Sequence, residues 1–207
     1  MVIFDFDGTI ADTYTVVFNH IDRLSEFKVD GFDINKVDHY KEIGLRELIK
    51  ELKLTKFKIF TISLKFRKLF GEYVTEIKPV DGIGSALEVL QQNGFKMGIL
   101  SSNSKSNIDT ILKLNSLAKY FTFVDSEFRI FSKANKLEKL ISKHNLNKND
   151  VFYVGDEVRD VEAAKECGVK SIAVTWGYNK AEALKAANPD YIVNNTKELA
   201  TILLNLK

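Results

Sequence analysis

The chain has 207 residues, of which 45% are hydrophobic and 28% are charged, and its formal net charge is +2. These values are typical of a globular protein with one domain, or one domain and an insertion, and they exclude a disordered or collagen-like chain. No apolar run approaches the roughly 20 residues of a membrane span, and a lone Cys167 excludes an internal disulfide framework. We therefore expect a cytoplasmic monomer or homodimer, with neither a nucleic acid nor a membrane as a partner.

The first predicted element is a short buried strand over residues 2–4, followed by the sequence Asp5-Phe6-Asp7-Gly8-Thr9. Neighbouring side chains on a strand point to opposite faces, so Asp5 and Asp7 share one face. A glycine next to them permits a tight turn or a close backbone approach. Two acids at a strand end before a glycine turn suit a divalent cation and a phosphoryl group. The alternative is that Asp7 and Gly8 form only a turn and that Asp5 is incidental.

Residues 13–78 show helical patterns over 19–27, 40–54 and 57–76, with no strand signal between them. Pro79 then marks the return to a different pattern. The segment is therefore predicted to be an all-helical insertion directly after the first strand.

From about residue 80 the sequence alternates between the periodicities of strands and helices. This alternation predicts a parallel α/β sheet with helices on both faces, in which ligands bind beyond the carboxyl ends of the strands. The predicted strands are 95–100, 121–124, 151–154, 171–174 and 191–193, and the predicted helices are 83–93, 105–115, 134–144, 160–167, 180–187 and 196–206.

Two of these strands end in polar residues suited to phosphate chemistry. Ser102 and Asn103 follow the strand over 95–100, although alone they are equally typical of a loop with a helix N-cap. Asp156 and Asp160 follow the strand over 151–154, four residues apart, so they can lie on one side of a helix start. Acids are also common there because the helix dipole favours them.

Lys133 opens the predicted helix over 134–144 and is a candidate for holding a phosphate. Most lysines are solvated, and Lys136 and Lys139 lie nearby. The residues alone leave the choice among the three lysines open.

The order of these elements resembles a known family. Asp5-x-Asp7-Gly-Thr, Ser102-Asn103, Lys133 and Gly155-Asp156-x-x-x-Asp160 are similar to the four motifs of haloacid dehalogenase-superfamily hydrolases. The resemblance spans the whole chain and is nearest to the phosphoglycolate phosphatase-like branch. It implies a Rossmann-like α/β core of residues 1–12 and 79–207, with a helical cap domain over 13–78.

The resemblance also implies the chemistry. Asp5 would be the nucleophile that forms an aspartyl-phosphate, and Asp7 the general acid and then the general base. Mg²⁺ would be held by the Asp5 carboxylate, the Asp7 backbone carbonyl and Asp156, with Asp160 supporting these ligands. The expected activity is Mg²⁺-dependent hydrolysis of a small phosphorylated metabolite, with 2-phosphoglycolate as one candidate.

In the same family, Ser102 and Lys133 would hold the phosphoryl group with help from Asn103. The acid Asp7 favours a phosphate ester as the substrate. The dehalogenase branch of the family lacks this acid, because its leaving group is a halide that needs no proton. Ala134 and Glu157 depart from the commonest family pattern. Arg46 of the cap is a candidate contact for a substrate carboxylate, and a solvated helix arginine is the alternative.

Other functions fit parts of the pattern. A sugar phosphomutase shares the capped fold and the aspartyl-phosphate. A phospho-receiver domain also phosphorylates an aspartate on an α/β sheet, but it needs neither Asp7 nor a helical insertion. A binding protein without activity is a further alternative, although all the motif residues are present.

Overall fold

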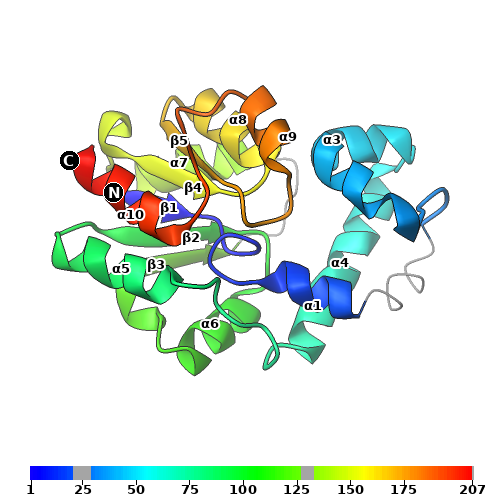
Figure 1. Ribbon diagram of the computed structural model, residues 1–207, viewed down its shortest axis with the longest axis horizontal. Coiled ribbons are helices and arrows are strands. Elements are labelled where there is room, and N and C mark those ends of the chain that lie inside the picture. Colours follow the sequence, from blue (N-terminus) through cyan, green and yellow to red (C-terminus); the bar gives the residue numbers. More distant parts are fainter. Residues whose placement is uncertain (21–28, 127–132, 207) are drawn as a thin grey trace.

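The computed structural model describes residues 1–20, 29–126 and 133–206. Its centre is a six-stranded sheet in the order β3-β2-β1-β4-β5-β6, in which every neighbouring pair is parallel. The strands are β1 (Val2–Phe4), β2 (Met97–Ser101), β3 (Phe121–Ser126), β4 (Phe152–Gly155), β5 (Lys170–Val174) and β6 (Tyr191–Val193). Figure 1 shows the N-terminal strand in the middle of the sheet and helices on both sides of it. The predicted α/β fold is confirmed.

The helices that cover the sheet are α5 (Ile83–Gln92), α6 (Lys105–Leu114), α7 (Lys133–Lys143), α8 (Val158–Cys167), α9 (Ala181–Ala186) and α10 (Thr196–Asn205). These helices and the strands end within a few residues of where the sequence places them. The short 3-10 helices Ile34–Lys36, Ala118–Tyr120 and Lys148–Asp150 were not predicted.

Side-chain alternation on β1 divides the core into two layers. Val2 and Phe4 belong to a buried cluster with residues of α5, α6 and α10, whereas Ile3 belongs to a second cluster with residues of α7 and α8. Strands buried on both faces in this way read as continuous apolar runs. Phe6 also lies in the first cluster, so the alternation persists beyond the strand and directs Asp5 toward the layer of α7 and α8.

Within the described part of residues 13–78, the α-helices are α1 (Thr13–Asn19), α3 (Val37–Glu51) and α4 (Lys56–Glu72). The structure describes no strand within residues 13–20 and 29–78. The predicted helices over 40–54 and 57–76 correspond to α3 and α4. The predicted helix over 19–27 lies almost entirely outside the described residues, and α1 was not predicted.

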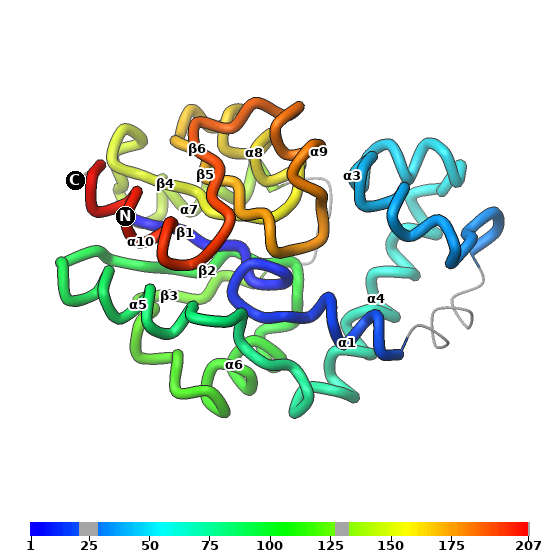
Figure 2. The backbone as a smooth tube through the Cα atoms, viewed as in Figure 1, coloured from blue at the N-terminus to red at the C-terminus, as the bar shows by residue number. Residues whose placement is uncertain are grey.

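The chain enters and leaves this helical segment at one place. Ala11 and Pro79 form an antiparallel bridge, Asp12 N donates to Lys78 O (2.8 Å), and Val80 N donates to Ile10 O (2.9 Å). Figure 2 shows the two connections side by side between the sheet and α1. This geometry supports the predicted boundaries of the cap at 12/13 and 78/79, and the division into domains stays a prediction.

Cys167, at the end of α8, is buried. Its Sγ donates to Ala134 O (3.0 Å), and burial raises the pKa of the thiol to about 11. Among the residues described, no helix combines the length and the apolar character needed to cross a membrane.

The loop before β6 is tied to β5 by one carboxylate. Ser171 N and Ser171 Oγ donate to Asp190 Oδ2 (2.8 and 2.7 Å), and Asp190 N donates to Ser171 Oγ (2.9 Å). Partial burial opposes ionisation of Asp190, but the hydrogen bonds from Ser171 outweigh it and hold the pKa of Asp190 below its usual value.

Because the folded state has the lower pKa, ionised Asp190 stabilises the fold above the unfolded pKa of about 3.9, and this contribution is lost as the pH falls through the folded pKa. We predict that Asp190→Asn lowers the free energy of unfolding by about 0.5–1 kcal/mol at pH 7, a modest value because solvent screens this exposed residue. The difference from the wild type should shrink at pH 3. Urea unfolding at both pH values measures it, and a difference that grows at pH 3 would contradict the assignment.

Candidate active site

The site begins where β1 ends. Asp5 is almost completely buried, and its N–H donates to Val154 O (2.8 Å), which extends the pairing of β1 with β4 by one residue. The chain then turns at Gly8, whose φ of +77° lies in the left-handed region that favours glycine. A Cβ on Gly8 would lie 2.4 Å from Asp156 Oδ2. The glycine is therefore required both by the turn and by the close approach of the acid.

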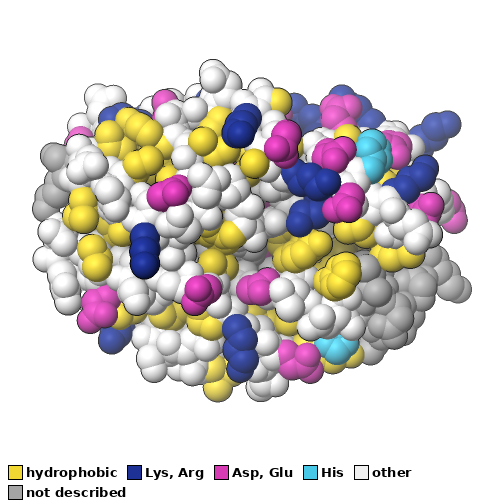
Figure 3. Space-filling model, viewed as in Figure 1, with side chains coloured by type: hydrophobic (Ala, Val, Ile, Leu, Met, Phe, Trp, Pro, Cys, Tyr) yellow, Lys and Arg dark blue, Asp and Glu magenta, His cyan; other side chains and the backbone are white. Residues whose placement is uncertain are grey.

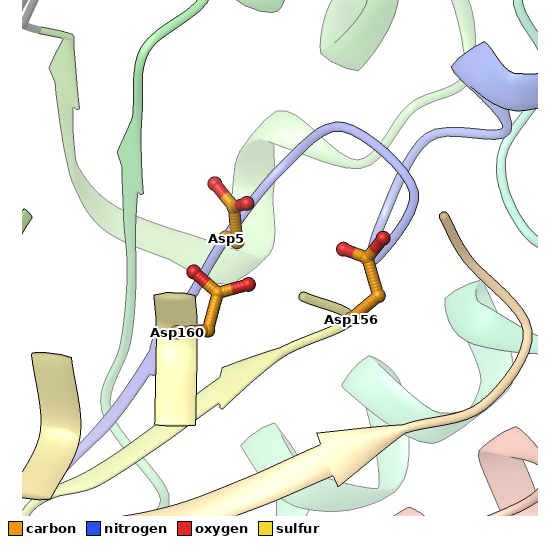
Figure 4. Close-up of side chains that lie close together, drawn as sticks. All are labelled: Asp5, Asp156 and Asp160. Carbon is orange, nitrogen blue, oxygen red and sulfur yellow. The ribbon is translucent and has the colours of Figure 1, made fainter. Parts of the chain in front are cut away.

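Three carboxylates from three elements converge at this edge of the sheet. Asp5 follows β1, Asp156 follows β4, and Asp160 lies in the first turn of α8. One oxygen of each lies within 4.8 Å of the others, and all three side chains are buried. Figure 4 shows how the two strand ends and the start of the helix bring them together. The structure thus assembles the three acids that the sequence placed far apart.

Lys133 compensates part of this charge. Its Nζ donates to Asp5 Oδ2 (2.8 Å) and to Asp160 Oδ1, and the lysine is itself buried. Burial alone would lower the pKa of Lys133, but the charges of Asp160 and Asp5 raise it well above the usual value. Of the three lysines considered from the sequence, the structure places Lys133 in the acid cluster.

Asp156 is held by neutral donors. Thr9 Oγ1 donates to Asp156 Oδ1 (2.6 Å), and Tyr178 N donates to Asp156 Oδ2 (2.8 Å). Complete burial, followed by the nearby charges of Glu157, Asp160 and Asp5, raises the pKa of Asp156 well above its usual value.

Asp7 has different surroundings from Asp5. Asn103 Nδ2 donates to Asp7 Oδ1 (2.9 Å). Burial and the charge of Asp5 raise the pKa of Asp7 to about 7, although the hydrogen bond from Asn103 acts in the opposite direction. A carboxyl group with this pKa can both donate and accept a proton near neutral pH.

A cavity of about 340 Å³ opens between Asp7 and the helices of the insertion. Ser102, Asn103 and Arg159 line it on the side of the sheet. The opposite side is mainly apolar and is formed by residues of α1, α3 and α4, among them Tyr14, Phe18, Tyr40, Leu48, Ile59, Phe66 and Phe70. Figure 3 shows hydrophobic side chains gathered over α1 and α4, where Phe18 and Phe60 are about half exposed.

The two arginines of α3 and α4 differ in their relation to the cavity. Arg46 is absent from its lining and pairs with Glu162 of α8 (3.4 Å), so the structure does not bring Arg46 to Asp7. Arg67 of α4 lines the cavity. Burial lowers the pKa of Arg67, and the charge of Asp7 opposes this shift. Arg67 was not predicted from the sequence, because the lysine-rich pattern of α4 gives no sign of which cation faces the site.

This geometry agrees with the comparisons to known proteins. The family model described as haloacid dehalogenase-like hydrolase matches residues 2–174. The chain belongs to this family. A phosphoglycolate phosphatase from Synechococcus elongatus is 31% identical over 206 residues, which cover 99% of this chain and 97% of that protein. The pyrophosphatase PpaX from Bacillus mycoides is 22% identical, with coverage of 98% and 95%.

The fold also matches solved structures of the family. The crystal structure of a predicted phosphatase from Clostridium acetobutylicum has a TM-score of 0.81 and 25% sequence identity, and the match covers 99% of this chain and 97% of that one. The predictions of a haloacid dehalogenase-type hydrolase and of an enzyme of the phosphatase class are therefore confirmed.

Family phosphatases use a divalent metal, and the donor set of this chain fits one. Carboxylate oxygens are the ligands that Mg²⁺ prefers. A buried carboxylate is costly unless it is paired or coordinates a metal. Lys133 donates hydrogen bonds to Asp5 and to Asp160. The hydrogen bonds to Asp156, in contrast, come from a neutral hydroxyl and a neutral backbone N–H. A cation beside Asp156 would offset the remaining negative charge.

Gly177 makes room for Asp156, since a Cβ at position 177 would lie 2.2 Å from Asp156 Oδ2. We predict that Gly177→Ala displaces this carboxylate and lowers the free energy of unfolding by about 1–3 kcal/mol. Gly84→Ala is the matched control, because a Cβ there meets Leu117 at 3.6 Å and alanine favours the helix α5. Chemical denaturation of both variants measures the effect. Equal stability of the Gly177→Ala variant and the wild type would contradict the close packing.

Proposed function

We propose that this protein is a Mg²⁺-dependent phosphatase that hydrolyses a small phosphorylated metabolite through an aspartyl-phosphate on Asp5. The observation that supports it best is the different environment of two acids that are two residues apart. Asp5 is buried and bonded to Lys133, whereas Asp7 faces the cavity with a raised pKa. Such a difference supports a nucleophile at Asp5 and proton transfer by Asp7.

In the first step, a carboxylate oxygen of Asp5 attacks phosphorus and the bond to the leaving oxygen breaks. Asp7 donates its proton to that oxygen. In the second step, Asp7 takes a proton from water as the water attacks phosphorus. The bond between phosphorus and Asp5 then breaks, phosphate leaves and the Asp5 carboxylate is restored.

The remaining site residues hold the phosphoryl group and the metal. Ser102, Asn103 and Lys133 would bind the phosphoryl oxygens. Mg²⁺, held by Asp5, Asp156 and the backbone carbonyl of Asp7, would offset the charge of the phosphoryl oxygens. Asp160 would support these ligands, and it is itself fixed by hydrogen bonds from Lys133 and Glu157 N.

The substrate remains open among small phosphorylated compounds. We take 2-phosphoglycolate and inorganic pyrophosphate as the first candidates, because similar proteins carry the names phosphoglycolate phosphatase and pyrophosphatase. Arg67 is better placed than Arg46 to contact the substrate, because it lines the cavity that contains Asp7. The cytoplasmic location and the monomer or homodimer stay predictions.

Asp5→Asn tests the nucleophile. We expect the wild type to release phosphate from p-nitrophenyl phosphate and from at least one of a panel of phosphorylated metabolites. This release should stop when EDTA removes the metal. The variant should lose at least about 10³-fold in kcat, because the amide is a poor nucleophile. Asp109→Asn, on the exposed side of α6, is the control. Wild-type activity of the Asp5→Asn variant would refute the aspartyl-phosphate, and transfer of phosphate to a second sugar position without release would favour the phosphomutase.

Asp7→Asn tests the proton transfer. The amide still accepts the hydrogen bond from Asn103, so substrate binding should persist while turnover falls about 10²–10⁴-fold. The loss in kcat/KM should be larger for an alkyl phosphate than for p-nitrophenyl phosphate, because p-nitrophenolate leaves with little help from an acid. Steady-state kinetics with both esters measures the difference. An equal loss for the two esters would contradict the role of general acid.

A further inference from the structure

One residue outside the four motifs joins helix α4 to the site. Asn107 lies near the start of α6 and is 8% exposed. Its Nδ2 donates to two oxygens: Arg67 O in α4 (3.0 Å) and Asn103 Oδ1 (3.0 Å). A single side-chain amide therefore contacts both the helical insertion and the loop after β2.

The second of these bonds fixes the orientation of Asn103. The oxygen of the Asn103 amide accepts from Ser104 N (2.7 Å) and from Asn107 Nδ2, and its nitrogen donates to Asp7 Oδ1. An amide has one donor end and one acceptor end. With two donors directed at the oxygen, the amino group of Asn103 must face Asp7.

Helix α4 approaches Asn107 through more than one contact. Gly71 follows Arg67 by one helical turn, and a Cβ at Gly71 would lie 3.3 Å from Asn107 Oδ1. A side chain at this position would press on Asn107. The position of α4 and the orientation of Asn103 are thus set at the same amide.

We propose that Asn107 is a positioning residue that couples helix α4 of the cap to Asp7 through Asn103. The coupling to catalysis rests on the proposed function of Asp7. When Asn103 holds Oδ1 of Asp7, the other carboxyl oxygen is directed to the leaving group. Without Asn107, the Asn103 amide loses one of the two donors that set its direction, and Asp7 loses its fixed orientation.

The test is Asn107→Asp, which has the shape of asparagine but cannot donate to Arg67 O or to Asn103 Oδ1. Position 107 is the third residue of α6, where an acid favours the helix, and Asp160 occupies the same position in α8. The variant should therefore fold. We expect kcat for an alkyl phosphate to fall about tenfold, which corresponds to the loss of about one hydrogen bond, while KM changes less than about twofold. Asn107→Ala should give the same loss.

Two comparisons separate this role from a general structural one. Asn115→Ala removes a side-chain hydrogen bond to Ile111 O at the other end of α6 and should leave kcat unchanged. In an Asn103→Ala background, Asn107→Asp should have no further effect on kcat. Wild-type kcat in Asn107→Asp, or the same tenfold loss in the Asn103→Ala background, would overturn the proposal.

A readout that needs no turnover keeps the coupling testable if the proposed function fails. The side-chain amide protons of Asn103 should change their NMR chemical shifts in Asn107→Asp and in Gly71→Ala, but not in Asn115→Ala. Unchanged Asn103 signals in Asn107→Asp would overturn the coupling, whatever the activity. A wild type that hydrolyses no phosphorylated compound would instead overturn the proposed function alone.

Discussion

The buried ammonium group of Lys133 is the charge on which the site depends. Asp5, Asp156 and Asp160 bring three carboxylates together away from water, and each buried anion costs several kcal/mol unless it is compensated. Lys133 bonds two of them directly. Since it is the first residue of α7, this helix must begin beside the end of β1. The charge requirement therefore fixes where α7 lies on the sheet.

The end of β1, which brings Asp5 to Lys133, also explains why Asp7 has different surroundings. Phe6 remains in the core between them, and the turn at Gly8 carries the chain away from the sheet. Asp7 consequently lies at the cavity, where Asn103 binds it and where burial and the charge of Asp5 raise its pKa. Two identical side chains thus have different surroundings: Asp5 is bonded to Lys133, whereas Asp7 is bonded to the Asn103 amide.

The sequence predicted the sheet, its edge and the acids at the strand ends from short patterns (buried runs, glycine turns and acids after strands), and Lys133 only through the family resemblance. It did not predict α1, Arg67 or Asn107. The bond between Asn107 and Arg67 joins residues 40 positions apart, and the bond between Thr9 and Asp156 spans 147 positions. Such pairs depend on how complete elements pack, and no local pattern records them. Arg46 was chosen for its guanidinium, but the course of α3 directs it to Glu162.

The central place of β1 also sets the order in which the molecule can be assembled. Val2 pairs with Met97 on one side and with Phe152 on the other. The strand β1, which is synthesised first, can therefore pair with both neighbours only after most of the chain has been synthesised. Contacts of such long sequence separation close slowly, whereas the backbone hydrogen bonds within α3 and α4 are local. Asp5 and Asp156 meet when β4 joins β1, so the acid cluster cannot form before this long-range pairing.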